Sequence, residues 1–254
     1  FSAELKSCID AIAQAMEDDA CRPSVPGVVE YLTNPPGELV TLVGQAAIHS
    51  AFLGLRRLTT GPLAGMVDAE TSDVLDSESP MICIDTSLLL GADAETKDIA
   101  RMCSQAWVDA LLQCGDGRFR IVLNEEAWAA LRNKYSAQAI DERLRMQGHW
   151  QCCSWLVFHE LNDVDQMASD LQHKEIVRGI ISKSPIKGIF PQNPAALALF
   201  VDFVQPNASE LAIVKNLKPH HGLWRLGEEY SAVVHVEATP EQFELFDNSA
   251  SRAG

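Results

Sequence analysis

Apolar runs typical of buried strands alternate with helical stretches over most of the chain after residue 76, and this alternation limits the fold more than any other feature. Helical spacing follows each of the runs MICID, FRIVLN, QCCSWLVFHE and IKGIF. Strands that are joined through helices pair in parallel, and a parallel sheet needs cover on both faces. The sequence therefore predicts an α/β fold with a mostly parallel sheet flanked by helices.

The two ends of the chain follow different patterns. Residues 2–18 carry apolar side chains at helical spacing, and a long helix is expected from Leu39 to Leu58. A loop rich in Gly, Pro, Ser and Asp then separates the parts. GLWRLG and YSAVVHVEA predict an antiparallel hairpin that closes the chain. We expect an all-helical segment at 1–75 and the α/β part at 76–254.

Composition excludes several functional classes. The formal net charge of -15 argues against a general nucleic-acid-binding surface, which needs clustered Lys and Arg. No two of the seven cysteines form a C-x-x-C pair, so neither a zinc ribbon nor a disulfide scaffold is expected. No apolar run is long enough to span a bilayer, and no signal peptide leads the chain. Phe1 stands in place of Met within a helical pattern, which predicts that the chain begins inside a larger protein.

Polar side chains gather where the predicted strands end. Asp85 follows MICI, Glu125 and Glu126 follow RIVLN, and His159 follows WLVF. Ligands of parallel sheets bind at these carboxyl ends. Nucleotide hydrolysis needs one carboxylate that holds magnesium and another that orients the attacking water, and adjacent acids can divide these tasks. The alternative is that both glutamates lie in the first turn of a helix, where the helix dipole favours negative charge. Spacing alone favours that alternative.

The other half of a nucleotide site, a G-x-x-x-x-G-K-[ST] phosphate loop, is absent from the sequence. The nearest stretch is GIISKS at 179–184, which lacks the second Gly and precedes a strand. Its Lys183 is expected to be a solvated loop charge. Without backbone N–H groups around the phosphates, this chain alone should bind ATP poorly.

Several segments, taken in order, resemble one family. They are TTGPLAGMVDAET, PMICIDTSLL, VLNEEAW, LRMQGHW followed by WLVFHELNDV, SPIKGIFPQNP, and ASELAIVKNLKPHHGLWRL. Together they are similar to the C-terminal motor domain of the conjugation and type IV secretion ATPases, of the TraC type, in the HerA–FtsK branch of RecA-like motors. The resemblance covers about residues 55–240. It implies a RecA-like fold that binds ATP and Mg2+.

The resemblance also implies roles for particular residues. Glu126 matches the catalytic Glu that polarises water, and Glu125 matches the Asp on the magnesium side. His159 matches the Gln that senses the terminal phosphate. Arg145 matches the arginine that reaches a neighbouring subunit's nucleotide, with Arg143 as the less favoured substitute.

The implied partners are further copies in a hexameric ring and a membrane-embedded secretion channel. DNA is a candidate partner of the full-length protein, although no basic patch is present here. The implied location is cytoplasmic, peripheral at the inner face of the cell membrane.

Three departures leave alternatives open. Glu125 is one methylene longer than Asp, His159 replaces an amide, and the Walker A segment would lie before residue 1. The chain is then either part of a working motor, a hydrolysis-deficient subunit with a structural or docking role, or an unrelated α/β enzyme with similar strand ends.

Overall fold

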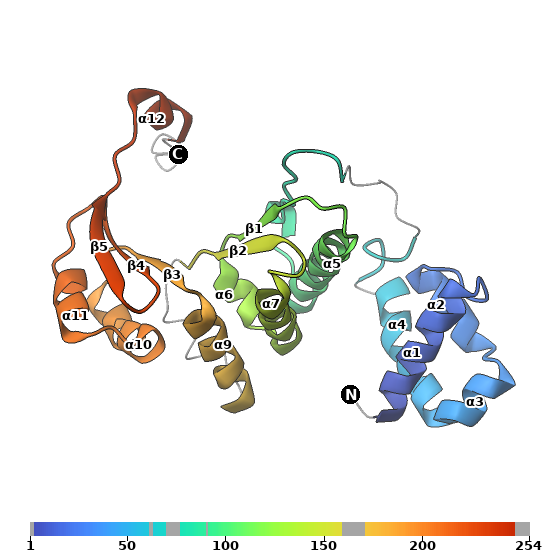
Figure 1. The fold of residues 1–254 in the computed structure, drawn as a ribbon. Coiled ribbons are helices and arrows are strands. Elements are labelled where there is room, and N and C mark those ends of the chain that lie inside the picture. The colour runs from blue at the N-terminus through green and yellow to red at the C-terminus, as the bar shows by residue number, and fades with distance from the viewer. Residues whose placement is uncertain (1–2, 61–62, 70–76, 90, 159–170, 247–254) are drawn as a thin grey trace. The chain divides into compact units, whose positions relative to one another are not determined.

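The chain folds into two units, residues 1–83 and 84–254, each of which is described by itself (Figure 1). The structure is a computed structural model, and it describes residues 3–60, 63–69, 77–89, 91–158 and 171–246. The helices of the first unit are α1 (Ala3–Glu17), α2 (Val25–Thr33), α3 (Gly37–Val43) and α4 (Gln45–Thr59). The elements described in the second unit are η1 (Ser87–Leu89), α5 (Ala94–Gln113), β1 (Arg120–Asn124), α6 (Ala127–Leu131), α7 (Lys134–Met146), β2 (Cys152–Leu156), α9 (Leu171–Lys183), β3 (Ile186–Ile189), α10 (Pro194–Val204), α11 (Ala208–Lys215), β4 (His221–Leu226), β5 (Tyr230–His235) and α12 (Pro240–Phe246).

The described elements of the first unit are helices around their own apolar core, which includes Cys8, Ile12 and Ile48. The long helix expected from Leu39 to Leu58 is split in two. Gly44, at φ 79°, separates α3 from α4 in a left-handed conformation that a glycine adopts without steric cost. No single described helix is long and apolar enough to cross a membrane. Helices α3 and α4 meet that test of length and composition only as a pair, and they are bent by 104°.

Strands β1 and β2 form a parallel pair that runs in register from Arg120 opposite Cys152 to Asn124 opposite Leu156. The connection between them passes through α6 and α7, and α7 packs against β2, α5 and α6 (Figure 1). Asn133 begins α7 by accepting hydrogen bonds from the first backbone N–H groups of the helix. This crossover places the end of α7 beside the start of β2, because Cys152 N donates to Gln147 O at 2.9 Å.

The expectation of a mostly parallel sheet is wrong for the described strands, because IKGIF does not extend the β1–β2 pair. It forms β3, which pairs antiparallel with β4, and β4 pairs antiparallel with β5. Gly188 lies opposite Trp224, and a Cβ at this glycine would lie 3.4 Å from the indole ring. Ile189 and Leu223 share a separate core with α10 and α11. Helix α12 follows β5.

The predicted strand MICID is also absent. Residues 81–86 form neither helix nor strand, and Met81 is 82% exposed. A strand is held by hydrogen bonds to a neighbouring strand, and none of the described strands pairs with this segment. Asp85 instead accepts hydrogen bonds from the Ser87 backbone N–H at 2.8 Å and from its hydroxyl at 3.0 Å.

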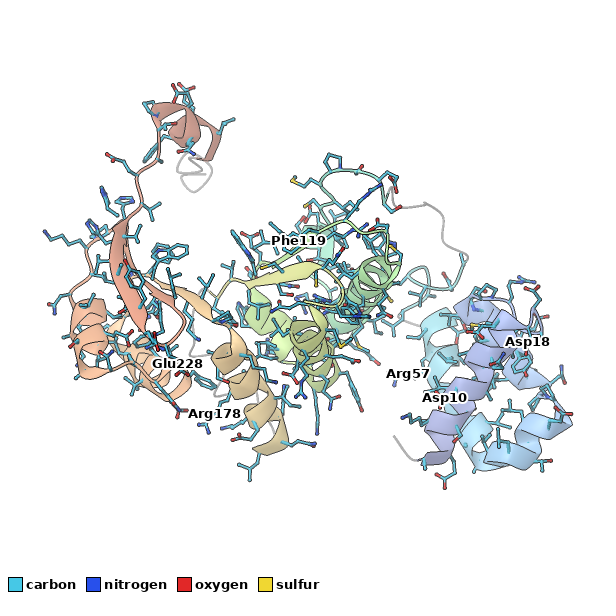
Figure 2. All side chains as sticks on the ribbon, viewed as in Figure 1. Asp10, Asp18, Arg57, Phe119, Arg178 and Glu228 are labelled. Carbon is cyan, nitrogen blue, oxygen red and sulfur yellow. The ribbon has the colours of Figure 1, made fainter. Side chains whose placement is uncertain are left out.

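The β1–β2 pair carries exposed apolar side chains. Ile121 is 60% exposed, while Leu123 and Trp155 are each 57% exposed. Phe119, which precedes β1, is 68% exposed and is labelled in Figure 2. The faces of parallel sheets are ordinarily covered by helices. The described helices therefore leave part of this strand pair uncovered.

Candidate functional site

The candidate site lies where β1 ends. Glu125 and Glu126 come directly after the strand, and α6 begins at the next residue. Both glutamates are exposed, and neither side chain is bonded to any described group. Glu126 has φ 48° and ψ 46°, a left-handed conformation that is uncommon for a residue with a side chain. Such strained residues concentrate at functional sites.

Backbone hydrogen bonds to Val157, the residue that follows β2, hold both sides of this turn. Val157 N donates to Asn124 O at 3.0 Å, and Ala127 N donates to Val157 O at 2.9 Å. The two glutamates are therefore presented at the carboxyl end of a parallel strand pair, where such sheets bind ligands. His159 follows Val157 by two residues, but it lies outside the described residues.

Neither carboxylate makes a capping contact at the N-terminal end of α6. Glu125 and Glu126 precede α6, which has five residues and no acidic residue in its first turn. Glu126 occupies the N-cap position, yet its side chain accepts no capping hydrogen bond. The alternative that spacing alone favoured therefore has no contact that supports it.

The left-handed conformation of Glu126 leads to a prediction about the stability of the protein. Replacing Glu126 by Gly should leave the free energy of unfolding unchanged or raise it by up to about 1 kcal/mol, because glycine has no Cβ to clash. Glu125 is not among the residues with positive φ. Glu125→Gly should therefore lower the free energy of unfolding by about 0.5–1 kcal/mol, because glycine adds conformational entropy to the unfolded chain. Urea unfolding followed by tryptophan fluorescence measures both, since every tryptophan lies in the second unit. Equal losses of the free energy of unfolding in the two variants would contradict backbone strain at Glu126.

Sequence reasoning placed Asn124 at the same strand end but gave it no role. The side-chain nitrogen Nδ2 of Asn124 is buried and has no hydrogen-bond partner among the described residues, and the same is true of Ser154 Oγ on β2. Buried donors without partners are rare and require an explanation. Asn124 precedes Glu125 directly, and its amide nitrogen is buried at the end of β1. Its place at the end of a strand was the signal that could have identified it.

The structure separates the two candidate arginines. Arg143 is 1% exposed. Its Nε donates to Asp109 Oδ1 at 2.8 Å, and its second terminal nitrogen makes an ion-pair contact with the same oxygen at 2.7 Å. An arginine that is buried against α5 cannot reach another subunit. Arg143 is therefore held within its own chain by Asp109, which favours Arg145 over Arg143 for the predicted role.

Arg145 has an exposed side chain, and it lies far from the glutamates. It belongs to the last turn of α7, which ends beside the start of β2. Glu126 lies beside the other end of that strand. β2 has 5 residues, and four rises of about 3.3 Å each separate its ends by about 13 Å. The structure does not bring Arg145 and Glu126 of one chain together.

The described residues contain no phosphate loop. Residues 179–183 of the GIISKS stretch are the last residues of α9, so their backbone N–H groups are used within the helix. Lys183 is not the solvated loop charge that we expected, because it ends α9 and binds Asp141. No group of three or more His, Cys, Asp or Glu side chains among the described residues could hold a metal ion by itself.

The donor set at the strand end nevertheless fits magnesium. The ion prefers carboxylate oxygens and keeps several of its waters, so it needs one or two carboxylates together with the phosphates of a substrate. Glu125 and Glu126 are exposed carboxylates of this kind. An open depression lined by Phe119, Gln147 and Cys153 lies instead at the start of the strands, away from this chemistry.

Fold and site together define a mixed α/β protein with a short parallel sheet and a carboxylate pair at its carboxyl end. No protein family model and no curated protein matches the chain. Among solved structures, the fold is similar to that of VirB4 of Thermoanaerobacter pseudethanolicus, with a TM-score of 0.73 and 16% sequence identity. The match covers 96% of this chain and 66% of that chain. The chain therefore has the fold of a part of VirB4.

Proposed function

We propose that this chain is the C-terminal portion of a P-loop ATPase that energises type IV secretion or conjugative DNA transfer. The observation that carries the proposal is the exposed, left-handed Glu126, which is presented at the end of a parallel strand by hydrogen bonds to Val157. The fold match to VirB4 supports the same class of motor. The test is ATP hydrolysis by the full-length protein and by its Glu126→Gln variant.

In this proposal each residue at the strand end has one task. Glu126 accepts the proton of the attacking water and orients it, and Glu125 holds magnesium through water. His159 donates a hydrogen bond to the terminal phosphate from one ring nitrogen. Bound Mg2+ neutralises charge on the phosphates of ATP. The backbone cradle for those phosphates would come from a part of the motor outside these 254 residues.

Arg145 would act on the nucleotide of a neighbouring copy in a ring, because its own Glu126 lies at the other end of β2. This predicts complementation between two inactive variants. Glu126→Gln subunits keep Arg145, whereas Arg145→Ala subunits keep Glu126. Mixing the two full-length variants should restore hydrolysis at the interfaces that combine an intact Glu126 with an intact Arg145. A steady-state ATPase assay over a range of mixing ratios measures this, and a mixture as inactive as its components would contradict an action between subunits.

The remaining parts of the proposal concern location and partners. The motor would form a homo-oligomer, hexameric by family resemblance, on the cytoplasmic side of a membrane-embedded secretion channel. DNA would be bound by other parts of the motor and not by a basic surface of this chain, because the net charge of this chain is -15.

A second candidate function is a hydrolysis-deficient subunit with a structural or docking role. The absence of a phosphate loop from the described residues and the longer side chain of Glu125 favour it. Isothermal titration of the full-length protein with ATP and magnesium separates the two functions. Binding with turnover supports the motor, whereas undetectable binding supports the docking subunit.

A further inference from the structure

Asp141 occupies the position on α7 that is one helical turn before Arg145. Its side chain is 13% exposed, and its Oδ2 accepts hydrogen bonds from Arg145 Nε at 3.0 Å and from a terminal nitrogen at 2.7 Å. Its other oxygen, Oδ1, accepts from Lys183 Nζ at 2.5 Å. One carboxylate thus joins Arg145 to the end of α9.

This contact differs from an isolated exposed ion pair on a helix, because one mostly buried carboxylate accepts hydrogen bonds from two cations. Exposed pairs at this spacing are screened by water and fix their side chains weakly. Burial raises the pKa of the Asp141 carboxyl, but the hydrogen bonds from Lys183 and Arg145 outweigh burial and lower the pKa overall. Asp141 is therefore ionised at neutral pH, and both cations remain bound to it.

The arrangement leaves the outer edge of the Arg145 guanidinium available. Asp141 takes the donor on Nε and one donor on the adjacent terminal nitrogen. The other terminal nitrogen and the remaining hydrogen form a second fork, which matches two oxygens of a phosphate. The side chain of Arg145 is 64% exposed, and no other described residue binds this edge.

We propose that Asp141 is the positioning residue for Arg145, holding one edge of the guanidinium so that its free edge faces the terminal phosphates of a nucleotide bound by a neighbouring copy. Lys183 binds the other oxygen of Asp141, and in this proposal it has no part in orienting Arg145. This inference rests on the proposed function, because it requires that Arg145 acts on a nucleotide. It adds a residue that acts through Arg145 without touching the substrate.

The test is a double-mutant cycle on ATP hydrolysis by the full-length protein. Arg145→Ala should lower kcat by about 10³-fold, as expected for an arginine that stabilises the transferring phosphoryl group. Asp141→Asn should lower kcat by about tenfold with KM unchanged, because a misplaced guanidinium binds the transition state less well. The double variant should be no slower than Arg145→Ala alone, because both changes remove the same interaction.

Lys183→Met is the control for a purely structural role. It breaks the connection between Asp141 and α9 but keeps both hydrogen bonds to Arg145, so kcat should stay within about twofold. If Asp141→Asn does not fold, Asp141→Glu replaces it in the cycle, since it keeps the charge and displaces the oxygens by one methylene.

The outcomes separate this inference from the proposed function. An unchanged kcat in Arg145→Ala would remove Arg145 from the proposed site. A large loss in Arg145→Ala together with a multiplicative loss in the double variant would overturn the role of Asp141 alone. An equal loss of kcat in Lys183→Met and Asp141→Asn would assign Asp141 to the packing of α7 on α9, and would likewise overturn the inference.

Discussion

Glu126→Gln in the full-length protein is expected to abolish ATP hydrolysis while leaving ATP binding intact. The amide keeps the size of the side chain and the left-handed backbone of this residue, so the turn between β1 and α6 should be preserved. It cannot accept the proton of the attacking water, and loss of a general base typically lowers kcat by about 10²–10⁴-fold. Steady-state hydrolysis measures kcat, and isothermal titration with ATP and magnesium measures binding.

Glu125→Gln is the matched neighbour. Glu125 is assigned to magnesium, so its loss should raise the magnesium concentration needed for half-maximal activity, and saturating magnesium should recover part of the rate. Glu126→Gln should not respond to added magnesium. Unchanged turnover in Glu126→Gln would remove Glu126 from the site. The same magnesium dependence in both variants would show that the tasks are not divided as we propose.

Glu210→Ala is expected to lower the free energy of unfolding of the second unit by about 3–5 kcal/mol, the usual cost of removing one partner of a buried ion pair. Glu210 is 5% exposed. Its carboxylate accepts hydrogen bonds from two nitrogens of Arg225 on β4 and also completes the capping box of α11 with Asn207. Without Glu210, the guanidinium of Arg225 would be left mostly buried without its carboxylate partner. Urea unfolding followed by tryptophan fluorescence measures the loss.

Glu228→Ala is the control, because Glu228 is an exposed glutamate in the turn between β4 and β5 (Figure 2). It should change the free energy of unfolding by no more than about 0.5 kcal/mol. A similar small effect of Glu210→Ala would show that the buried pair contributes little.

The cost of Glu210→Ala should also depend on pH. The hydrogen bond from Arg225 is the main cause that lowers the pKa of Glu210 below its usual value. A lowered pKa in the folded state adds stability that is fully present above the unfolded value of about 4.3 and is lost as pH falls through the folded value. The difference between wild type and Glu210→Ala should therefore shrink at pH values below about 4. A difference that stays constant down to acid unfolding would contradict this linkage.

Local pattern was sufficient where the cause of a structure is local. The spacing of apolar residues predicted helices at α1 and α7, because a helix makes its backbone hydrogen bonds within one stretch of chain. The runs RIVLN and CCSWL are strands, and the crossover between them makes their pairing parallel. The position of Glu125 and Glu126 after β1 followed from these two elements. Their chemical roles stay predictions.

Local pattern failed where the cause is a distant neighbour. MICID is as apolar as RIVLN, but a strand needs a partner for its N–H and C=O groups, and the described residues offer it none. IKGIF forms β3, which pairs with β4, a strand that begins more than thirty residues later. The prediction of a mostly parallel sheet was wrong for this reason, because an apolar run in the sequence does not indicate which strand it will pair with.

By itself, therefore, the sequence determined the order of the elements and the carboxylate pair at the end of β1. The tertiary structure decided how those residues are presented. It placed Glu126 in a left-handed turn held by Val157, because a strand end is shaped by hydrogen bonds to its neighbour. It also separated two arginines on the same helix, burying Arg143 against Asp109 and leaving Arg145 exposed beside Asp141. The burial of Arg143 depends on Asp109, which lies far away in the chain, and no local pattern contains that contact.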